Sequence, residues 1–231
     1  MRPRSQSNPR AGFSPADFLV VLAVLALLLA VLVPILARSK SKARRAVCLA
    51  NLGQVSRALL LYAEDNQKAL PTPANSPPTG VWWWYKEQVK GYIGLKGPSS
   101  SQDKVFACPS DRGYTEDEKA RPFCLSPRFD YGSYVFNGVN LPGVPHLVGR
   151  ELGTINHPAK TLLVMEWSAH APLSWHDSRT GKANFPFYND ALNAVAFVDG
   201  HVDYIKIYYD GLNAAYTRDP IFGYNYKYSG D

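Results

Sequence analysis

One uninterrupted apolar segment constrains this chain more than any other feature. Residues 18–37 read FLVVLAVLALLLAVLVPILA, twenty residues without a charged side chain. As a helix rising ~1.5 Å per residue, this segment is about 30 Å long, the thickness of a bilayer's hydrocarbon core. The sequence therefore predicts one transmembrane helix, and the rest of the 231 residues suffices for one medium-sized domain.

The positive charge of the chain lies on both sides of this segment. Eight of the 25 basic side chains, but only one of the 19 acidic ones, fall within residues 1–45. Residues 46–231 consequently carry 17 basic and 18 acidic side chains. A nucleic-acid-binding domain would place its basic residues on a folded face. We therefore expect a membrane and no nucleic acid among the partners.

The stretch before the apolar segment is short, polar and basic. Residues 1–12 read MRPRSQSNPRAG, and a secretory signal peptide begins in the same way. The apolar core of a signal peptide is usually shorter and ends at a small-residue cleavage site. Here the apolar run continues through Pro34 into a charged segment of helical pattern. This continuation favours a retained membrane anchor.

The residues at this junction resemble the start of type IV prepilins and type II secretion pseudopilins. Members of that family have a basic leader ending in Gly, then Phe, an acid at the fifth mature position and about twenty apolar residues. Gly12, Phe13 and Asp17 stand in that arrangement. Asp17 replaces the Glu of the family, and Ser14-Pro15-Ala16 stands where the family usually has Thr-Leu-Ile or similar residues. Pro34 falls at the twenty-second mature position, where many pilins have a helix-kinking proline.

The resemblance implies a processing and assembly pathway. A prepilin peptidase would cleave between Gly12 and Phe13, remove residues 1–12 as a leader, and methylate the new amino terminus at Phe13. Asp17 and Pro34 would act in assembly, with Asp17 pairing with the terminal amine of a neighbouring subunit. The alternative from the residues alone makes Asp17 an N-cap of the membrane helix.

The same resemblance implies a location and further partners. The protein would lie in a bacterial inner membrane as a single-pass protein, with its leader cytoplasmic and its body periplasmic or extracellular. Its partners would be like or related pilin subunits and an inner-membrane assembly platform. The five basic residues that follow the span favour the opposite orientation by the positive-inside rule. We adopt the orientation of the family.

A second helical pattern follows the membrane segment, within residues 38–70. Cys48, Leu52, Val55, Leu59 and Tyr62 recur at spacings of four and three, which predicts an apolar stripe on one helix face. Pro71 and Pro73 are helix-ending residues. The segment CLANLGQVSRALLLYAEDNQKALP also resembles a subgroup of pilin-like proteins. We expect the helix to continue from residues 13–37 and to pack this stripe against the globular domain.

Residues 71–231 are expected to form that globular domain. Its strand candidates are residues 132–137, 161–166 and 194–205, the last being a hairpin with Asp199-Gly200 as a type I′ turn pair. The expected fold is thus α+β, a long helix on a small antiparallel sheet, as in pilins. Many related proteins have His, nine residues and Asp-Gly near the C-terminus. Here Asn189 replaces that His, so the resemblance implies only the hairpin and no role that depends on the His.

Aromatic residues open the globular domain. Trp82, Trp83 and Trp84 precede a short amphipathic pattern that extends to Ile93. Three consecutive tryptophans cannot share one helical face, so at least one should be partly exposed. Core packing with a subunit contact is the favoured interpretation, and a carbohydrate platform is the alternative.

Three cysteines are present, and an oxidising compartment would allow one disulfide. Cys108 and Cys124 lie in loop-like sequence 16 residues apart, whereas Cys48 lies on the helical stripe. The loop spacing predicts a Cys108–Cys124 bridge worth on the order of 3 kcal/mol by loop entropy, and Cys48 as a free, buried side chain. Cys108-Pro109-Ser110-Asp111 resembles a recurrent segment of the same subgroup.

Signals for chemistry are weak. Glu166, His170, His176 and Asp177 have the right types for zinc, but Pro172 interrupts them and no helical register unites them. Calcium is another possibility, with oxygen ligands available at Asp177, Asn189, Asp190 and Asp199, though not at EF-hand spacing. The sequence contains no familiar catalytic or nucleotide-binding motif, so no enzyme and no required cofactor are expected.

The sequence thus predicts a structural subunit of a type IV pilus-like or type II secretion pseudopilus filament. An exported binding protein with one membrane span and an aromatic-rich body is the main alternative. A membrane-anchored metallohydrolase using the histidine cluster is a third. Processing at Gly12 separates the first function from the other two.

Overall fold

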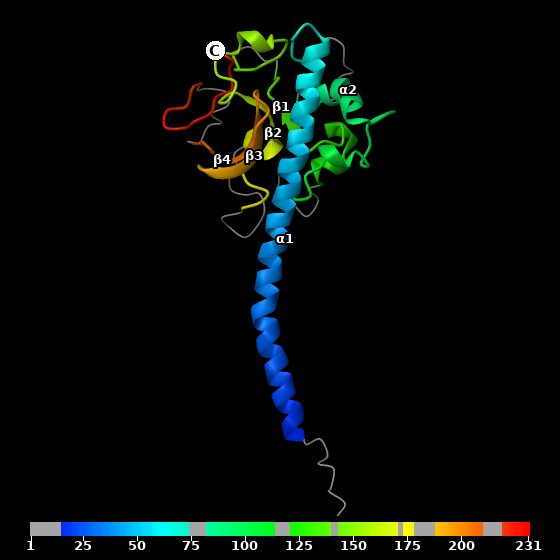
Figure 1. The fold of residues 1–231 in the computed structure, drawn as a ribbon, viewed down its shortest axis with the longest axis vertical. Coiled ribbons are helices and arrows are strands. Elements are labelled where there is room, and N and C mark those ends of the chain that lie inside the picture. The colour runs from blue at the N-terminus through cyan, green and yellow to red at the C-terminus, as the bar shows by residue number, and fades with distance from the viewer. Residues whose placement is uncertain are drawn as a thin grey trace, which may run out of the picture. The chain divides into compact units, whose positions relative to one another are not determined.

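The computed structural model describes residues 15–73, 82–113, 121–139, 143–170, 173–177, 188–209 and 219–231. These residues form one long helix, α1 (Pro15–Asp65), a four-stranded sheet and several short helices (Figure 1). The chain divides into two compact units, Met1–Lys42 and Ala43–Asp231, and α1 belongs to both. The predicted α+β class is confirmed.

Helix α1 ends before the prolines that follow it. Asn66 donates its side-chain amide to the carbonyl of Tyr62 at 2.8 Å, which satisfies one of the last carbonyls of the helix. Gln67 and Lys68 then adopt positive φ angles of 57° and 63°. Two successive residues in the left-handed region reverse the chain direction. A polar turn, and not Pro71, therefore ends the helix at Asp65.

The second unit is built on an antiparallel sheet in which neighbouring strands follow chain order. Its strands are β1 (Tyr134–Phe136), β2 (Leu162–Glu166), β3 (Ala191–Phe197) and β4 (Val202–Ile207). All three pairings are antiparallel, and β3 pairs with β4 along its length, from Ala191 opposite Ile207 to Ala196 opposite Val202. The strands β1 and β2 are buried at every position. The three predicted strand regions are confirmed.

The connection between β3 and β4 differs from the predicted turn. Phe197 donates to the carbonyl of His201, and Gly200 donates to the carbonyl of Phe197, each at 2.9 Å. Gly200 has a φ of 90°, whereas Asp199 is not among the positive-φ residues. This is a three-residue connection with glycine in the left-handed position, and not a type I′ turn. Asp199 and Gly200 still form the turn.

The predicted stripe of α1 packs against the sheet. Cys48, Leu52, Val55 and Leu59 have no exposed surface, and Tyr62 is half-buried. A side chain at Gly53 would meet Val202, and one at Gly200 would meet Leu60, each at 3.5 Å. The guanidinium of Arg45 lies 4.7 Å from the ring centre of Tyr204. Residues 45–60 of α1 therefore run along β4 in the opposite chain direction.

Short helices and aromatic side chains complete the core. Trp83 and Trp84 are buried and Trp82 is half-buried, as three adjacent tryptophans require. They are followed along the chain by α2 (Tyr85–Val89) and the 3-10 helix η2 (Lys90–Ile93). The other short helices are η3 (Lys104–Phe106), η4 (Phe123–Leu125), η5 (Pro127–Phe129), η6 (Leu152–Thr154) and α3 (Trp167–His170).

Candidate functional site

The first candidate site is the apolar part of α1. Every side chain from Asp17 to Arg44 is exposed, including the whole of the apolar run 18–37. By length and composition, α1 qualifies as a helix that can cross a membrane. Such a helix near the N-terminus is consistent with a single membrane span or with a signal sequence. An exposed apolar surface of this extent is typical of segments that contact a membrane or another protein.

Two of the predicted assembly residues lie in this part of α1. Asp17 is the acidic residue of the first turn, where a carboxylate is favoured by the helix dipole. Pro34 lies inside the helix, which continues on both sides of it. Because proline has no N–H, the carbonyl one turn earlier loses its usual partner. The cleavage residues Gly12 and Phe13 lie outside the described residues.

The second candidate site is a buried group of polar side chains in the second unit, and it begins with a disulfide. The bond joins Cys48 and Cys108, whose Cα atoms lie 5.1 Å apart, while Cys124 is free. The predicted Cys108–Cys124 bridge is therefore wrong. The disulfide closes a separation of 60 residues, which by loop entropy is worth about 4 kcal/mol.

Asn51 explains this pairing. Its side-chain amide donates to the carbonyls of Lys104 and Ala107, at 3.2 and 3.0 Å. These bonds hold the segment that contains η3 against α1, within one helical turn of Cys48. Cys108, the next residue along the segment, then lies beside Cys48. Sequence spacing missed this pairing because it compared only separations along the chain.

Cys124 is fixed in a different network. Asp111 accepts from the backbone N–H of Cys124 at 3.0 Å and from the hydroxyl of Ser133 at 2.7 Å. Burial raises the pKa of the Cys124 thiol to about 11, and the nearby Asp111 carboxylate adds to this effect. The thiol of Cys124 is therefore protonated and unreactive at neutral pH.

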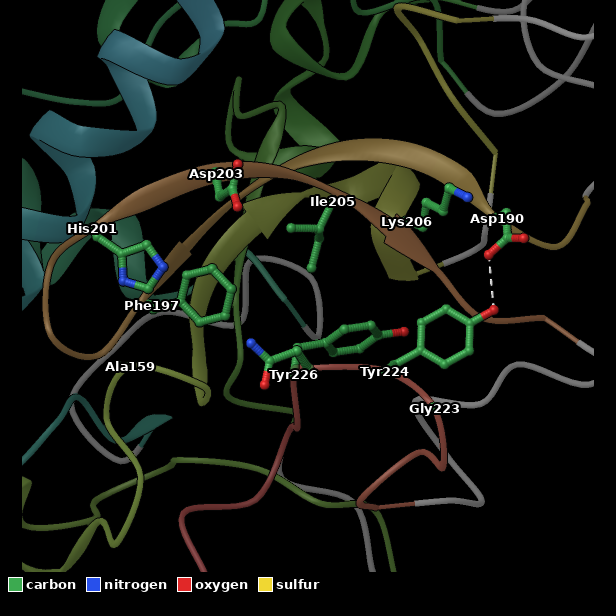
Figure 2. A pocket seen from close by; sticks show the side chains of 11 residues that line it. Ala159, Asp190, Phe197, His201, Asp203, Ile205, Lys206, Gly223, Tyr224 and Tyr226 are labelled. Carbon is green, nitrogen blue, oxygen red and sulfur yellow. Dashed lines mark hydrogen bonds between the residues drawn. The ribbon is translucent and has the colours of Figure 1, made fainter.

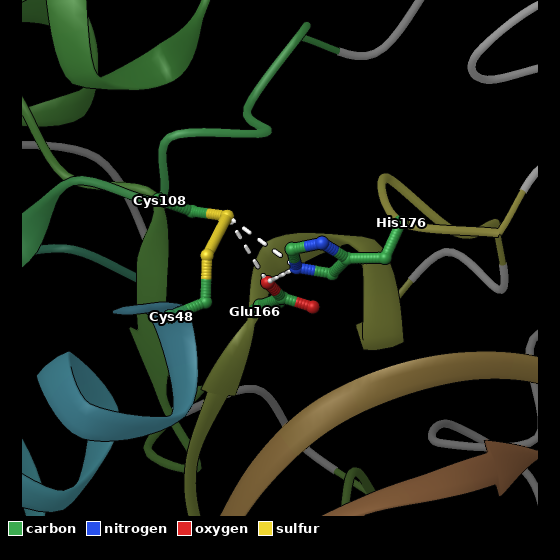
Figure 3. A group of neighbouring side chains, drawn as sticks. All are labelled: Cys48, Cys108, Glu166 and His176. Atoms are coloured by element: carbon green, nitrogen blue, oxygen red, sulfur yellow. Dashed lines mark hydrogen bonds and ion pairs between the residues drawn. A yellow bond between two sulfur atoms is a disulfide. The ribbon is translucent and has the colours of Figure 1, made fainter. Parts of the chain in front are cut away.

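Two further side chains meet the disulfide (Figure 3). Glu166 ends β2 and is fully buried, and its Oε1 lies 2.8 Å from Nε2 of His176. The Sγ atom of Cys108 lies 3.2 Å from Oε1 of Glu166 and 3.6 Å from Nε2 of His176. Four donor atoms of types that bind transition metals thus lie within 4.8 Å of one another.

The structure divides the histidine cluster that the sequence suggested for zinc. Glu166 and His176 come together, but His170 and Asp177 do not belong to their group. His170 ends α3 in an aromatic environment, with ring centres 5.8 Å from Trp82 and 6.2 Å from Tyr228. Burial lowers the pKa of His170 to about 4, so it is neutral at physiological pH.

A pocket of about 500 Å³ lies beside β4 (Figure 2). Its lining combines aromatic and charged side chains, and the ring of His201 stacks on that of Phe197 at 4.2 Å. Tyr224 donates its hydroxyl to Asp190 at 2.8 Å across one end. The lining also includes Asp203, Lys206 and Tyr226.

Three of the four oxygen ligands suggested for calcium accept hydrogen bonds within the chain. Asn189 accepts from the backbone N–H of Tyr209 at 2.8 Å, and Asp190 accepts from Tyr224. Asp199 accepts from the backbone N–H of His201 at 3.1 Å. Asp177 is not part of the one metal-type group of His, Cys, Asp and Glu side chains found among the described residues.

The long apolar helix and the four-stranded antiparallel sheet define a pilin-like architecture. No protein-family model, no curated protein sequence and no solved structure matches this chain.

Proposed function

We propose that this chain is a structural subunit of a type IV pilus-like or type II secretion pseudopilus filament. The observation that carries the proposal is the contrast within α1. Its residues 17–44 are exposed and mostly apolar, whereas residues 48–59 place a buried stripe in the core of the second unit. One helix thus supplies both an apolar anchor and a buried stripe that belongs to the core of a folded domain.

Lateral packing of such helices supplies a physical mechanism for assembly. In a membrane, apolar helices associate through van der Waals packing and interhelical polar contacts. In the proposed filament, Asp17 pairs with the terminal amine of Phe13 on a neighbouring subunit, because a buried carboxylate requires a positive partner. The inner-membrane assembly platform and related pilin subunits would be the partners, and the protein would have no enzymatic activity.

A second function is favoured by the pocket beside β4. Its aromatic rings and charged groups are suited to a small ligand that has both a ring and hydrogen-bonding groups. A membrane-anchored, exported binding protein would use this pocket, with α1 serving only as the anchor. That function requires no peptidase cleavage at Gly12.

The amino terminus of the mature protein distinguishes the two functions. We predict that co-expression with a prepilin peptidase yields a chain that begins at N-methylated Phe13, as measured by mass spectrometry of the intact protein. Gly12→Val should block this maturation, because a side chain at the cleavage position obstructs the close approach that glycine allows.

Ala11→Val is the matched control, since it adds bulk one residue away and should leave cleavage intact. Recovery of chains that retain Met1 from assembled material would contradict the filament proposal. Cleavage at another position by a general signal peptidase would contradict it as well and would favour the binding protein.

A further inference from the structure

The buried group beside the Cys48–Cys108 bond contains one carboxylate, that of Glu166. Glu166 has no exposed surface, and its Oε2 accepts from the backbone N–H of Ala194 at 3.0 Å. Its Oε1 faces only His176 and Cys108, and no lysine or arginine of the described residues forms an ion pair with it. A buried carboxylate is costly without strong compensation.

The disulfide does not supply that compensation. Sγ of Cys108 lies at hydrogen-bonding distance from Oε1, 3.2 Å. A sulfur in a disulfide carries no proton, so it cannot donate to the carboxylate. A thiol, or a cation bound between sulfur and oxygen, makes this contact with the carboxylate attractive. The geometry around Oε1 therefore suits the reduced cysteines better than the oxidised pair.

The four donor atoms converge on one point from four separate segments (Figure 3). Cys48 comes from α1, Cys108 from the segment after η3, Glu166 from the end of β2, and His176 from residues 173–177. Arg112 donates to the carbonyl of Trp175 and so positions the residue before His176. Each donor is thus fixed by a different part of the fold.

The distances approach those of a tetrahedral site. With bonds of about 2.0–2.3 Å, the ligand atoms of four-coordinate zinc lie about 3.3–3.8 Å apart. Sγ of Cys108 is 3.2 Å from Oε1 of Glu166 and 3.6 Å from Nε2 of His176. The 2.8 Å between His176 and Glu166 must widen by about 0.5 Å, and the two sulfurs must separate once their bond is reduced.

We propose that Cys48, Cys108, Glu166 and His176 bind one zinc ion when the two cysteines are reduced. Two thiolates, one carboxylate and one imidazole fill all four positions of a tetrahedral ion, which is typical of a structural site and leaves no place for substrate. The thiol protons pass to solvent when the metal binds. Zinc and the disulfide are mutually exclusive because they use the same sulfurs. The disulfide joins α1 to the segment after η3, and the zinc ion would join both of these to β2 through Glu166.

Metal binding by the full-length chain in detergent tests this proposal. A phosphine reduces the disulfide: it supplies two electrons and takes the oxygen of one water, whose two protons go to the sulfurs. Cobalt(II) is then added to the reduced and to the oxidised protein without oxygen. We expect one cobalt per reduced chain, with sulfur-to-cobalt charge transfer and tetrahedral ligand-field bands, and displacement by one equivalent of zinc. The oxidised chain should bind none at this site.

Two variants separate this site from other thiols. His176→Gln should weaken zinc binding at least about tenfold, since even outer-shell partners of metal sites contribute ten- to a hundredfold. Cys124→Ser, the matched control, should bind as the wild type does. Circular dichroism before metal addition verifies that each protein keeps its fold.

Three results would overturn the proposal. The first is that reduced and oxidised wild type bind cobalt equally. The second is that Cys124→Ser loses binding while His176→Gln retains it. The third is that the reduced chain binds metal only after it loses its native circular dichroism. None of these measurements depends on filament assembly, so the metal site and the proposed function are tested separately.

Discussion

Burial changes the acid–base behaviour of individual side chains in this protein, and His170 is the clearest case. It is 4% exposed and lies between aromatic rings. Burial lowers the pKa of this ring to about 4 in the folded protein. In the unfolded chain the ring binds a proton near pH 6.5. Acid therefore favours the unfolded state through this residue.

We predict that His170 makes the protein acid-sensitive between pH 6.5 and 4. Stability is lost as the pH falls through this window, by about 3 kcal/mol in total, and no further below the folded pKa. His170→Gln should remove this dependence. Denaturant unfolding at pH 7 and pH 4 gives the free energy of unfolding of both proteins at each pH. We expect this free energy to fall less between the two pH values in the variant than in the wild type.

The wild type must be compared with His170→Gln because another residue changes stability with pH in the opposite direction. Burial raises the pKa of Asp130 to about 6, so this carboxyl group stabilises the fold when protonated and does so less as the pH rises through that value. His201→Gln, which alters an exposed ring, is the matched control. An unchanged pH dependence in His170→Gln would show that this ring is not the acid-sensitive group.

At the scale of the element, α1 combines two different environments in one helix. The spacing of Cys48, Leu52, Val55 and Leu59 predicted the buried stripe, and each of these side chains is fully buried. The stripe is narrow, because Leu61 on another face is 50% exposed. Helical periodicity alone separates these faces.

Leucine-to-alanine substitutions at two positions of α1 test the difference between its buried stripe and its exposed face. Leu59→Ala should destabilise the folded domain by about 2–5 kcal/mol, because it leaves a cavity against the sheet. Leu61→Ala on the exposed face should change stability by no more than about 0.5 kcal/mol. Equal losses at the two positions, measured by denaturant unfolding, would mean that the exposed face of α1 is also covered.

At the scale of the whole molecule, charge and apolar surface are distributed unevenly along the chain. Residues 46–231 carry 17 basic and 18 acidic side chains, and the large exposed apolar residues cluster at positions 18–36. Association should therefore depend on the first unit of the chain and not on the second.

We predict that deletion of residues 1–37 yields a soluble, folded and largely monomeric protein. The deletion removes the exposed apolar run and leaves the complete Ala43–Asp231 unit. Full-length processed protein should instead form crosslinks between neighbouring chains in membranes. Size-exclusion chromatography with light scattering tests the first expectation, and chemical crosslinking tests the second.

Asp17 variants are the controls for the crosslinking experiment. Asp17→Ala should insert into membranes as before but crosslink less, because the partner amine then lacks its carboxylate. Asp17→Glu should crosslink as well as the wild type. Equal crosslinking by the alanine variant would indicate that Asp17 acts only on the first turn of its own helix. An aggregated deletion variant would indicate that the second unit has its own association surface.

The sequence by itself determined the parts of this protein that depend on local patterns. The apolar run of residues 18–37 identified the membrane-type helix, the four-and-three spacing identified the buried stripe, and alternation with Asp199-Gly200 identified the β3–β4 hairpin. Each pattern lies within one continuous segment, and it follows from the period of that segment's own helix or strand.

The tertiary structure decided what depends on residues that are distant in the chain. Cys48 pairs with Cys108 because Asn51 holds residues 104–107 against α1, and the sequence offered no measure of that proximity. Glu166 and His176 meet at the same point, while His170 turns to an aromatic environment four residues after Glu166. Contacts between separate elements depend on how those elements pack, and short-range periodicity carries no information about that packing.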